Sequence, residues 1–282
     1  MTSCSSTEVR RCRPLLGTFV EMTAEGHDAE SMNRAIESAF VAMERVEKLM
    51  SFFRPDSDVA RLNRQAFREQ VMVNADTFLV LEHGLALSRA SNGAFDFTVA
   101  SPLLVQMVQR ENAPLPNLPG DWRDVELLPG NRVSFRRPLH LDLGGIAKGF
   151  AVDVAVDCLR ATGVESGMVN AGGDLRAFGP RKYLVDIRHP AFPQAMAHRV
   201  ELQGCALATS SPCFTETERN GQRVSHLVNP LDRSSLLGHR SVSVQAPECW
   251  LADGLAKVVF NAPLLAETLL EEFGAHAFVL SA

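Results

Sequence analysis

The chain has 282 residues, of which 46% are hydrophobic and 22% are charged, a composition typical of a globular protein with a sizeable core. Its formal net charge of -5 argues against a dedicated nucleic-acid binder, because such proteins usually carry a basic face. No apolar run approaches the roughly 20 residues that cross a bilayer, so we expect no membrane span. The run LLGTFV near the N-terminus is too short for a signal sequence, and there is no lipobox, so the sequence predicts a cytoplasmic protein.

The first third of the chain predicts one strand followed by helices. Residues 15–26 are rich in β-forming side chains and predict the first strand. In residues 27–50, apolar side chains recur every three or four positions, which predicts an amphipathic helix with Asp28 as its N-cap. Shorter helices are expected over residues 56–64 and 75–91.

The remainder of the chain predicts mostly strands. A hairpin is expected over residues 124–135, and a buried helix over 144–162 would end at Gly163. Six strands are expected next, over residues 166–173, 183–189, 198–203, 205–210, 225–229 and 241–246. Helices over 250–260 and 263–273 and a strand over 276–282 complete the chain. Because there are no regular βαβ units, the sequence predicts an α+β fold built around antiparallel sheets rather than a doubly wound parallel sheet.

Four stretches hold more glycine and polar residues than packing requires: SNGAFDFTVASPL, LDLGGIAKGF, VNAGGDLRAFG and SHLVNP. In the second, a strand would end at Asp142, and a double glycine would open a helix that carries Lys148. Backbone N–H groups at such a helix start can bind an anion, and a lysine adds a point charge. Close strand–helix packing with an exposed lysine would explain the same pattern equally well. His226, in the fourth stretch, stands alone, and a lone histidine is more often structural than catalytic.

Several common catalytic motifs are missing from the sequence. It contains no G-x-S-x-G, no H-E-x-x-H and no compact histidine–cysteine cluster, so serine hydrolases and zinc enzymes have little support. Five carboxylates spread along the chain weakly favour a nucleotide or phosphate site with a hard cation. These are Asp96, Asp142, Asp153, Asp174 and Asp253.

Seven stretches, taken in order, resemble the FAD:protein FMN transferases, also called ApbE-like flavin transferases. They are LLGTFVEM, MSFFRPDSDVARLN, GAFDFTVASPL, LDLGGIAKGFAVD, VNAGGDLRAFG, SHLVNP and SVSVQAPECWLADGLAKVVF. The resemblance spans nearly the whole chain and implies one α+β unit over residues 1–282 with a flavin-binding cleft. It also implies transfer of FMN from FAD to a threonine hydroxyl of a target protein, with release of AMP and normally with help from Mg²⁺. Some members of this family instead hydrolyse FAD to FMN and AMP.

The resemblance also implies which residues form the site. The family's metal would lie near the Gly145 carbonyl and the Asp253 carboxylate. His226 would take the proton of the acceptor hydroxyl as a general base, a role worth about 10²–10⁴ in rate. The flavin and adenine pockets would involve Leu16, Phe53, Ala94, Phe95, Asp96, Asp142, Lys148 and Leu227.

One departure from the family pattern bears directly on the chemistry. Lys257 stands four residues after Asp253, where the family's metal site has a threonine. A lysine offers no acceptor to Mg²⁺, which prefers octahedral oxygen ligands, and it adds positive charge.

Three interpretations of Lys257 follow. In the first, the Lys257 ammonium replaces the metal at the pyrophosphate. In the second, Lys257 pairs with Asp253, and the protein binds FAD with little activity. In the third, the Lys257 side chain swings away and Mg²⁺ still binds. Lys257 is therefore a candidate catalytic residue. The alternative functions are a non-catalytic flavin carrier and an FAD pyrophosphatase.

Overall fold

The computed structural model describes residues 7–99, 118–192, 194–219 and 221–281. Its centre is a seven-stranded sheet with the order β1-β2-β6-β7-β10-β13-β14, in which every pairing is antiparallel. The strands are β1 (Thr7–Leu15), β2 (Thr18–Gly26), β6 (Ser166–Ala171), β7 (Asp174–Phe178), β10 (Ala206–Ser210), β13 (Arg240–Ala246) and β14 (His276–Ser281). The antiparallel sheet and the helices packed on it confirm the predicted α+β class.

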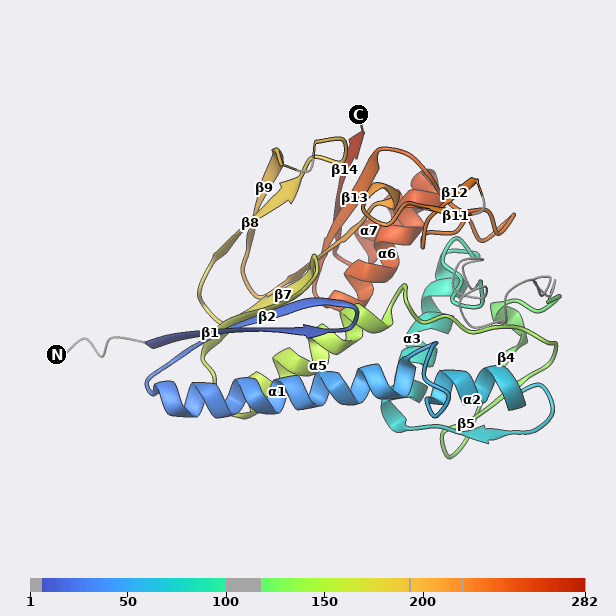
Figure 1. The fold of residues 1–282 in the computed structure, drawn as a ribbon, viewed down its shortest axis with the longest axis horizontal. Coiled ribbons are helices and arrows are strands. Elements are labelled where there is room, and N and C mark those ends of the chain that lie inside the picture. The colour runs from blue at the N-terminus through green and yellow to red at the C-terminus, as the bar shows by residue number, and fades with distance from the viewer. Residues whose placement is uncertain (1–6, 100–117, 193, 220, 282) are drawn as a thin grey trace.

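Three helices cover one face of this sheet (Figure 1), and they are α1 (Ala29–Met50), α5 (Ala147–Ala161) and α6 (Cys249–Asn261). Alternate side chains of a strand point to opposite faces, so Val20 and Met22 of β2 share the helix-facing side and are fully buried. The main hydrophobic core fills this interface. The predicted cap of α1 is confirmed, because the Asp28 carboxylate accepts from Ser31 N at 2.8 Å.

A β-hairpin packs on the opposite face of the sheet. It consists of β8 (Tyr183–Arg188) and β9 (Met196–Leu202), and in Figure 1 it rises on the side away from α1. A second, smaller core joins the hairpin to the sheet, with Ile187 of β8 packed among Leu175 and Leu207. The sheet therefore lies between a layer of helices and a partial layer of strands.

The other elements are short and lie around this centre. The predicted hairpin over 124–135 is confirmed as β4 (Val125–Leu128) and β5 (Arg132–Phe135), which join β3 (Val71–Met72) in a small sheet. The rest are α2 (Asp58–Gln65), α3 (Ala75–Ala90), α7 (Pro263–Glu272), β11 (Thr217–Arg219), β12 (Gln222–Val224) and two 3-10 turns, Trp122–Asp124 and Pro212–Phe214. None of the helices in the described ranges combines the length and the apolar character of a bilayer span.

The prediction of a single first strand over residues 15–26 is wrong. The chain forms the hairpin of β1 and β2 instead, because Leu16 and Gly17 both adopt positive φ, 56° and 70°, as a tight type I′ turn requires. The Leu16 N–H donates to Glu47 Oε1 of α1 at 2.8 Å, which ties the turn to the helix. A Leu-Gly pair lacks the usual Asn-Gly signature, so the sequence pattern did not reveal the turn.

Two further strand predictions are wrong. Residues 225–229 form a loop that holds a single isolated bridge, between Val228 and Ser235. No strand ends at Asp142. The preceding residue, Leu141, pairs with a side chain instead of a strand, because its N–H donates to Asn63 Oδ1 at 2.7 Å and its carbonyl accepts from Asn63 Nδ2 at 3.1 Å.

One strand of the central sheet, β7, also escaped prediction. The strand β7 follows β6 through Gly172 and Gly173, which both adopt positive φ, 66° and 105°. Two glycines between apolar runs are a signal for a hairpin of two strands, whereas the prediction was a single strand over residues 166–173 that ended in the glycines. The last four residues of the GAFDFTVASPL stretch, 100–103, lie outside the described residues.

Candidate active site

A cavity of about 770 Å³ lies where loops from distant parts of the chain meet the ends of α1, α5 and α6. Eleven of the twelve predicted site residues line it: Leu16, Phe53, Ala94, Phe95, Asp96, Asp142, Gly145, Lys148, His226, Leu227 and Lys257. The twelfth, Asp253, is only 1% exposed and lies beneath Lys257. The fold thus brings together every residue that the family resemblance singles out.

The turn that follows α1 places an aromatic ring at the cavity. Ser51 caps the C-terminus of the helix, and its hydroxyl accepts from the backbone N–H of Phe53 at 3.2 Å and of Arg54 at 3.3 Å. Phe53 remains 52% exposed and lies edge-on to Phe52, with 6.0 Å between the ring centroids. A half-exposed ring on a cavity wall offers a flat apolar surface on which a planar ring system can stack.

Residues 94–98 are held by side-chain hydrogen bonds. Asn261 at the end of α6 donates its Nδ2 to the Ala94 carbonyl at 2.9 Å. The Asp96 carboxylate accepts from the N–H and the hydroxyl of Thr98 at 2.8 and 2.7 Å. Burial raises the pKa of Asp96 above its ordinary value, although both Thr98 bonds oppose that shift. Such a carboxyl is suited to donate or accept a hydrogen bond with a polar ligand group.

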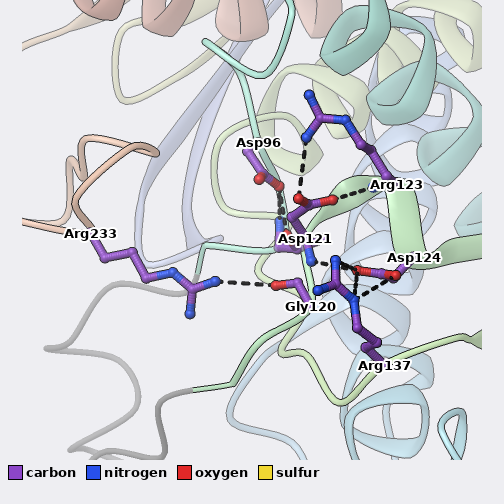
Figure 2. Close-up of polar contacts among 8 residues, drawn as sticks. Asp96, Gly120, Asp121, Arg123, Asp124, Arg137 and Arg233 are labelled. Carbon is purple, nitrogen blue, oxygen red and sulfur yellow. Dashed lines mark hydrogen bonds and ion pairs between the residues drawn. The ribbon is translucent and has the colours of Figure 1, made fainter.

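An arginine anchors the loop that carries His226. Arg233 adopts positive φ, 59°, and donates to the carbonyls of Leu118 and Gly120 at 3.0 and 3.1 Å. Figure 2 shows Arg233 extended toward Gly120, beside the Asp121–Arg123 pair. The second half of this loop is therefore fastened to a segment more than a hundred residues away in sequence.

The other end of the same loop is closed by a serine. Ser225 is fully buried, and its hydroxyl donates to the Leu236 carbonyl at 2.6 Å and to the Leu227 carbonyl at 3.1 Å. The Leu236 N–H in turn donates to the Leu227 carbonyl at 2.8 Å. This closed loop leaves His226 exposed on the cavity wall, as a group that takes a proton from a large substrate must be.

Two lysine–aspartate ion pairs form the floor of the cavity. Lys148 of α5 pairs with Asp174, and Lys257 of α6 pairs with Asp253. The lysine side chains are 32% and 18% exposed, whereas the carboxylates are 2% and 1% exposed. Both pairs therefore turn their positive ends toward the cavity and keep their negative ends in the protein, which favours an anionic ligand.

The pKa values in this cluster reflect burial and close charges. Burial and the neighbouring Asp174 together raise the pKa of Asp253 to about 6, although Lys257 and Lys148 oppose the shift. Burial alone would lower the pKa of Lys148, but the carboxylates of Asp174 and Asp253 outweigh it and raise the value. Lys148 is consequently held as a cation by the carboxylates beneath it.

The donor set does not suit the divalent cation that the family resemblance implies. Asp253 Oδ1 is taken by the Lys257 ammonium, and Asp253 Oδ2 accepts from Gly149 N at 3.3 Å. A Cβ built on Gly145 would lie 3.6 Å from Lys257 Cε, so the lysine stem runs between Gly145 and Asp253, where the metal was expected. The described residues also hold no group of three or more His, Cys, Asp or Glu side chains arranged for a metal.

Some residues of the site were not singled out by the sequence analysis. Asp174 was noted as a carboxylate but given no partner, because nothing in the sequence indicates that it lies against Lys148. Arg233 and Asn261 act through backbone carbonyls of distant segments, which no local pattern reveals. The glycines before Asp174 were the one available signal.

Comparison with known proteins identifies the relatives of this chain. A family model described as the ApbE family matches residues 16–279. The FAD:protein FMN transferase of Treponema pallidum is 29% identical over 90% of this chain and 78% of that protein, and its Vibrio cholerae counterpart is 31% identical over 76% and 69%. The crystal structure of the apo flavinyl transferase ApbE of Pseudomonas stutzeri superposes with a TM-score of 0.81 at 26% identity, covering 100% of this chain and 93% of that one.

Proposed function

Because this chain belongs to the ApbE family, and because its relatives are FAD:protein FMN transferases, we propose that it transfers FMN from FAD to a threonine side chain of an acceptor protein and releases AMP. The observation that carries this proposal is the meeting of eleven predicted site residues around one cavity. That cavity offers an aromatic wall at Phe53 for a flavin ring and a cationic floor at Lys148 and Lys257 for a pyrophosphate.

The proposed reaction is a phosphoryl transfer. The threonine oxygen attacks the phosphorus of the FMN half, and the bond from that phosphorus to the AMP oxygen breaks. The hydroxyl proton passes to His226, and AMP leaves as a phosphate monoester. Because such reactions need little covalent help from the protein, positioning and charge neutralisation supply most of the rate.

Lys257 supplies the charge neutralisation in this proposal. Its ammonium lies between Gly145 and Asp253 and faces the cavity, so it can contact a pyrophosphate oxygen without a metal. Asp253 fixes its direction, and Lys148 adds a second fixed cation held by Asp174. A lysine is a point charge with three donors, which suits an oxygen whose charge rises during the reaction.

The experiment that tests the function uses the pure protein, FAD and a pool of peptides of about ten residues, each with one central threonine. We expect AMP in the solution and peptides that carry covalently bound, fluorescent flavin, in equal molar amounts. AMP and free FMN without flavin-bearing peptides would identify an FAD pyrophosphatase instead. FAD that stays bound through gel filtration with no AMP formed would identify a flavin carrier.

A further inference from the structure

A second cavity, of about 390 Å³, adjoins the candidate active site. The two cavities share four lining residues, Thr18, Gly172, Arg188 and Thr209, so they meet at these residues. We call this second cavity the side groove. The side groove contains no site residue that the family resemblance implies. The proposed phosphoryl transfer does not use it either.

The floor of the side groove is one face of the central sheet. Strand register places Cys12 opposite Glu21, Glu21 opposite Asn170, Asn170 opposite Leu175 and Leu175 opposite Leu207. All five line the groove, and residues in register share a face, so they form a single row across β1, β2, β6, β7 and β10. This row lies on the face opposite the helices, under the β8–β9 hairpin.

The wall of the side groove is an edge of β8. Four consecutive residues, Val185 to Arg188, line it, whereas no residue of β9 does. Consecutive strand residues point to opposite faces, so a cavity that touches all four runs along the backbone edge of the strand, on the side away from β9. Within the described ranges, β8 pairs with β9 alone. This edge therefore has the arrangement that accepts an additional strand.

The surface of the side groove suits a polypeptide rather than a charged small molecule. Its two carboxylates are already paired, Glu21 with Arg10 and Asp186 with Arg199. Phe19, two residues from Glu21 on the same face of β2, is 71% exposed and lies in the groove. An exposed aromatic ring beside the outer edge of a two-stranded hairpin is the combination that peptide-binding sheets use, with main-chain bonds for affinity and a side-chain contact for specificity.

We propose that the side groove binds an extended segment of the acceptor protein as a strand added to β8. The proposal rests on the proposed function, because that reaction needs a threonine that reaches the phosphorus of FAD from outside the main cavity. A segment lying along β8 toward Arg188 would deliver its threonine at the shared residues Thr18, Gly172 and Thr209. FAD fills the main cavity, and the acceptor backbone stays in the groove.

Hydrogen exchange tests the placement without requiring turnover. The FAD-loaded protein is mixed with the tightest-binding member of a pool of peptides of about ten residues that carry one threonine. We expect slower exchange of the amides of Val185 to Ile187, which line the groove alone, when the peptide is added to the FAD complex, and no change in these amides when FAD is added alone. Slower exchange of these three amides with FAD alone would make the groove part of the FAD site and overturn the proposal.

A pair of matched variants supplies the second readout. Phe19→Asp should weaken peptide binding about tenfold and leave FAD binding unchanged, because Phe19 lies in the groove and not in the main cavity. Phe67→Asp is the control, since Phe67 is 51% exposed and lines neither cavity, and it should change neither affinity. Equal peptide affinities in these two variants would overturn the proposal.

Failure of the groove can be told apart from failure of the proposed function. If AMP is released and peptides become flavinylated while no peptide protects β8, the groove proposal is wrong and the proposed transfer stands. If no AMP forms from FAD with any peptide while β8 is protected by a peptide, the groove stands as a peptide site and the proposed transfer is wrong.

Discussion

At the scale of single residues, the site depends on where four charges sit relative to the cavity. Lys148 and Lys257 reach its surface, and Asp174 and Asp253 lie below them, nearly free of solvent. Buried ion pairs add little net stability, but removing one partner leaves an uncompensated charge and is costly. The carboxylates are therefore as important to the site as the lysines.

Replacing the carboxylate below Lys148 tests that dependence. Asp174→Asn should lower the free energy of unfolding by about 1–3 kcal/mol, because it leaves the Lys148 ammonium, whose side chain is 32% exposed, without its buried partner. The measurement is urea unfolding followed by circular dichroism. Glu201→Gln is the matched control, because Glu201 pairs with Lys182 on the surface at 2.7 Å, and its loss should cost under about 0.5 kcal/mol. Equal losses in both variants would show that the Lys148 pair is not special.

The histidine on the cavity wall gives a kinetic prediction. His226→Asn should lower kcat for FMN transfer by about 10²–10⁴ if His226 takes the hydroxyl proton. The affinity for FAD, measured by quenching of flavin fluorescence, should not change, because His226 is exposed and belongs to a loop closed by Ser225 and Arg233. A kcat close to that of the wild type would remove His226 from the mechanism.

At the scale of elements, α5 and α6 must approach closely for their lysines to share one cavity. Gly149 makes this possible, since a Cβ built there would lie 2.8 Å from Trp250 Cα and would also collide with the Cys249 backbone. The neighbouring Asp153 strengthens the same contact, because its carboxylate accepts from Cys249 N and Trp250 N at 2.9 and 2.8 Å. Sequence alone does not show which glycine carries such a contact.

Adding a methyl group at this contact tests its importance. Gly149→Ala should destabilise the protein by about 1–3 kcal/mol, because backbone atoms cannot move aside as a flexible side chain can. Thermal unfolding measures the loss. The comparison variant is Gly145→Ala, whose new Cβ would meet Phe95 Cε2 at 3.5 Å, an ordinary contact distance, so a loss under about 1 kcal/mol is expected. The reverse order of the two losses would contradict the close helix approach.

Elements with a strong local pattern could be predicted from the sequence, and elements set by turns could not. The periodic apolar positions of α1 and its Asp28 cap predicted both ends of that helix to within two residues. The Leu16–Gly17 turn was missed because its left-handed backbone at Leu16 is imposed by the hairpin and by Glu47, not by a turn-forming residue. Residues 225–229 have a strand-like composition, but the side chain of Ser225 closes them into a loop.

At the scale of the whole molecule, the site exists only because loops far apart in sequence converge at one end of the sheet. The resemblance of ordered stretches to a family predicted that these residues share one site, and eleven of them line one cavity. Their spacing along the sequence alone could not have predicted this. The order of strands in the central sheet could not be predicted from the sequence. The side groove beside the cavity depends on that order, so it could not be predicted either. The extent of a single unit over residues 1–282 and a cytoplasmic location stay predictions.

In the proposed reaction the Lys257 ammonium takes the place of a metal, and AMP release with and without Mg²⁺ shows directly whether it does. AMP release from FAD in the presence of threonine peptides is followed for the wild type and for Lys257→Thr, each with EDTA and with Mg²⁺. We expect the wild type to work equally well in both conditions, and Lys257→Thr to be inactive in EDTA and to recover with Mg²⁺. A wild type that is inactive in EDTA and restored by Mg²⁺ would contradict this role of Lys257.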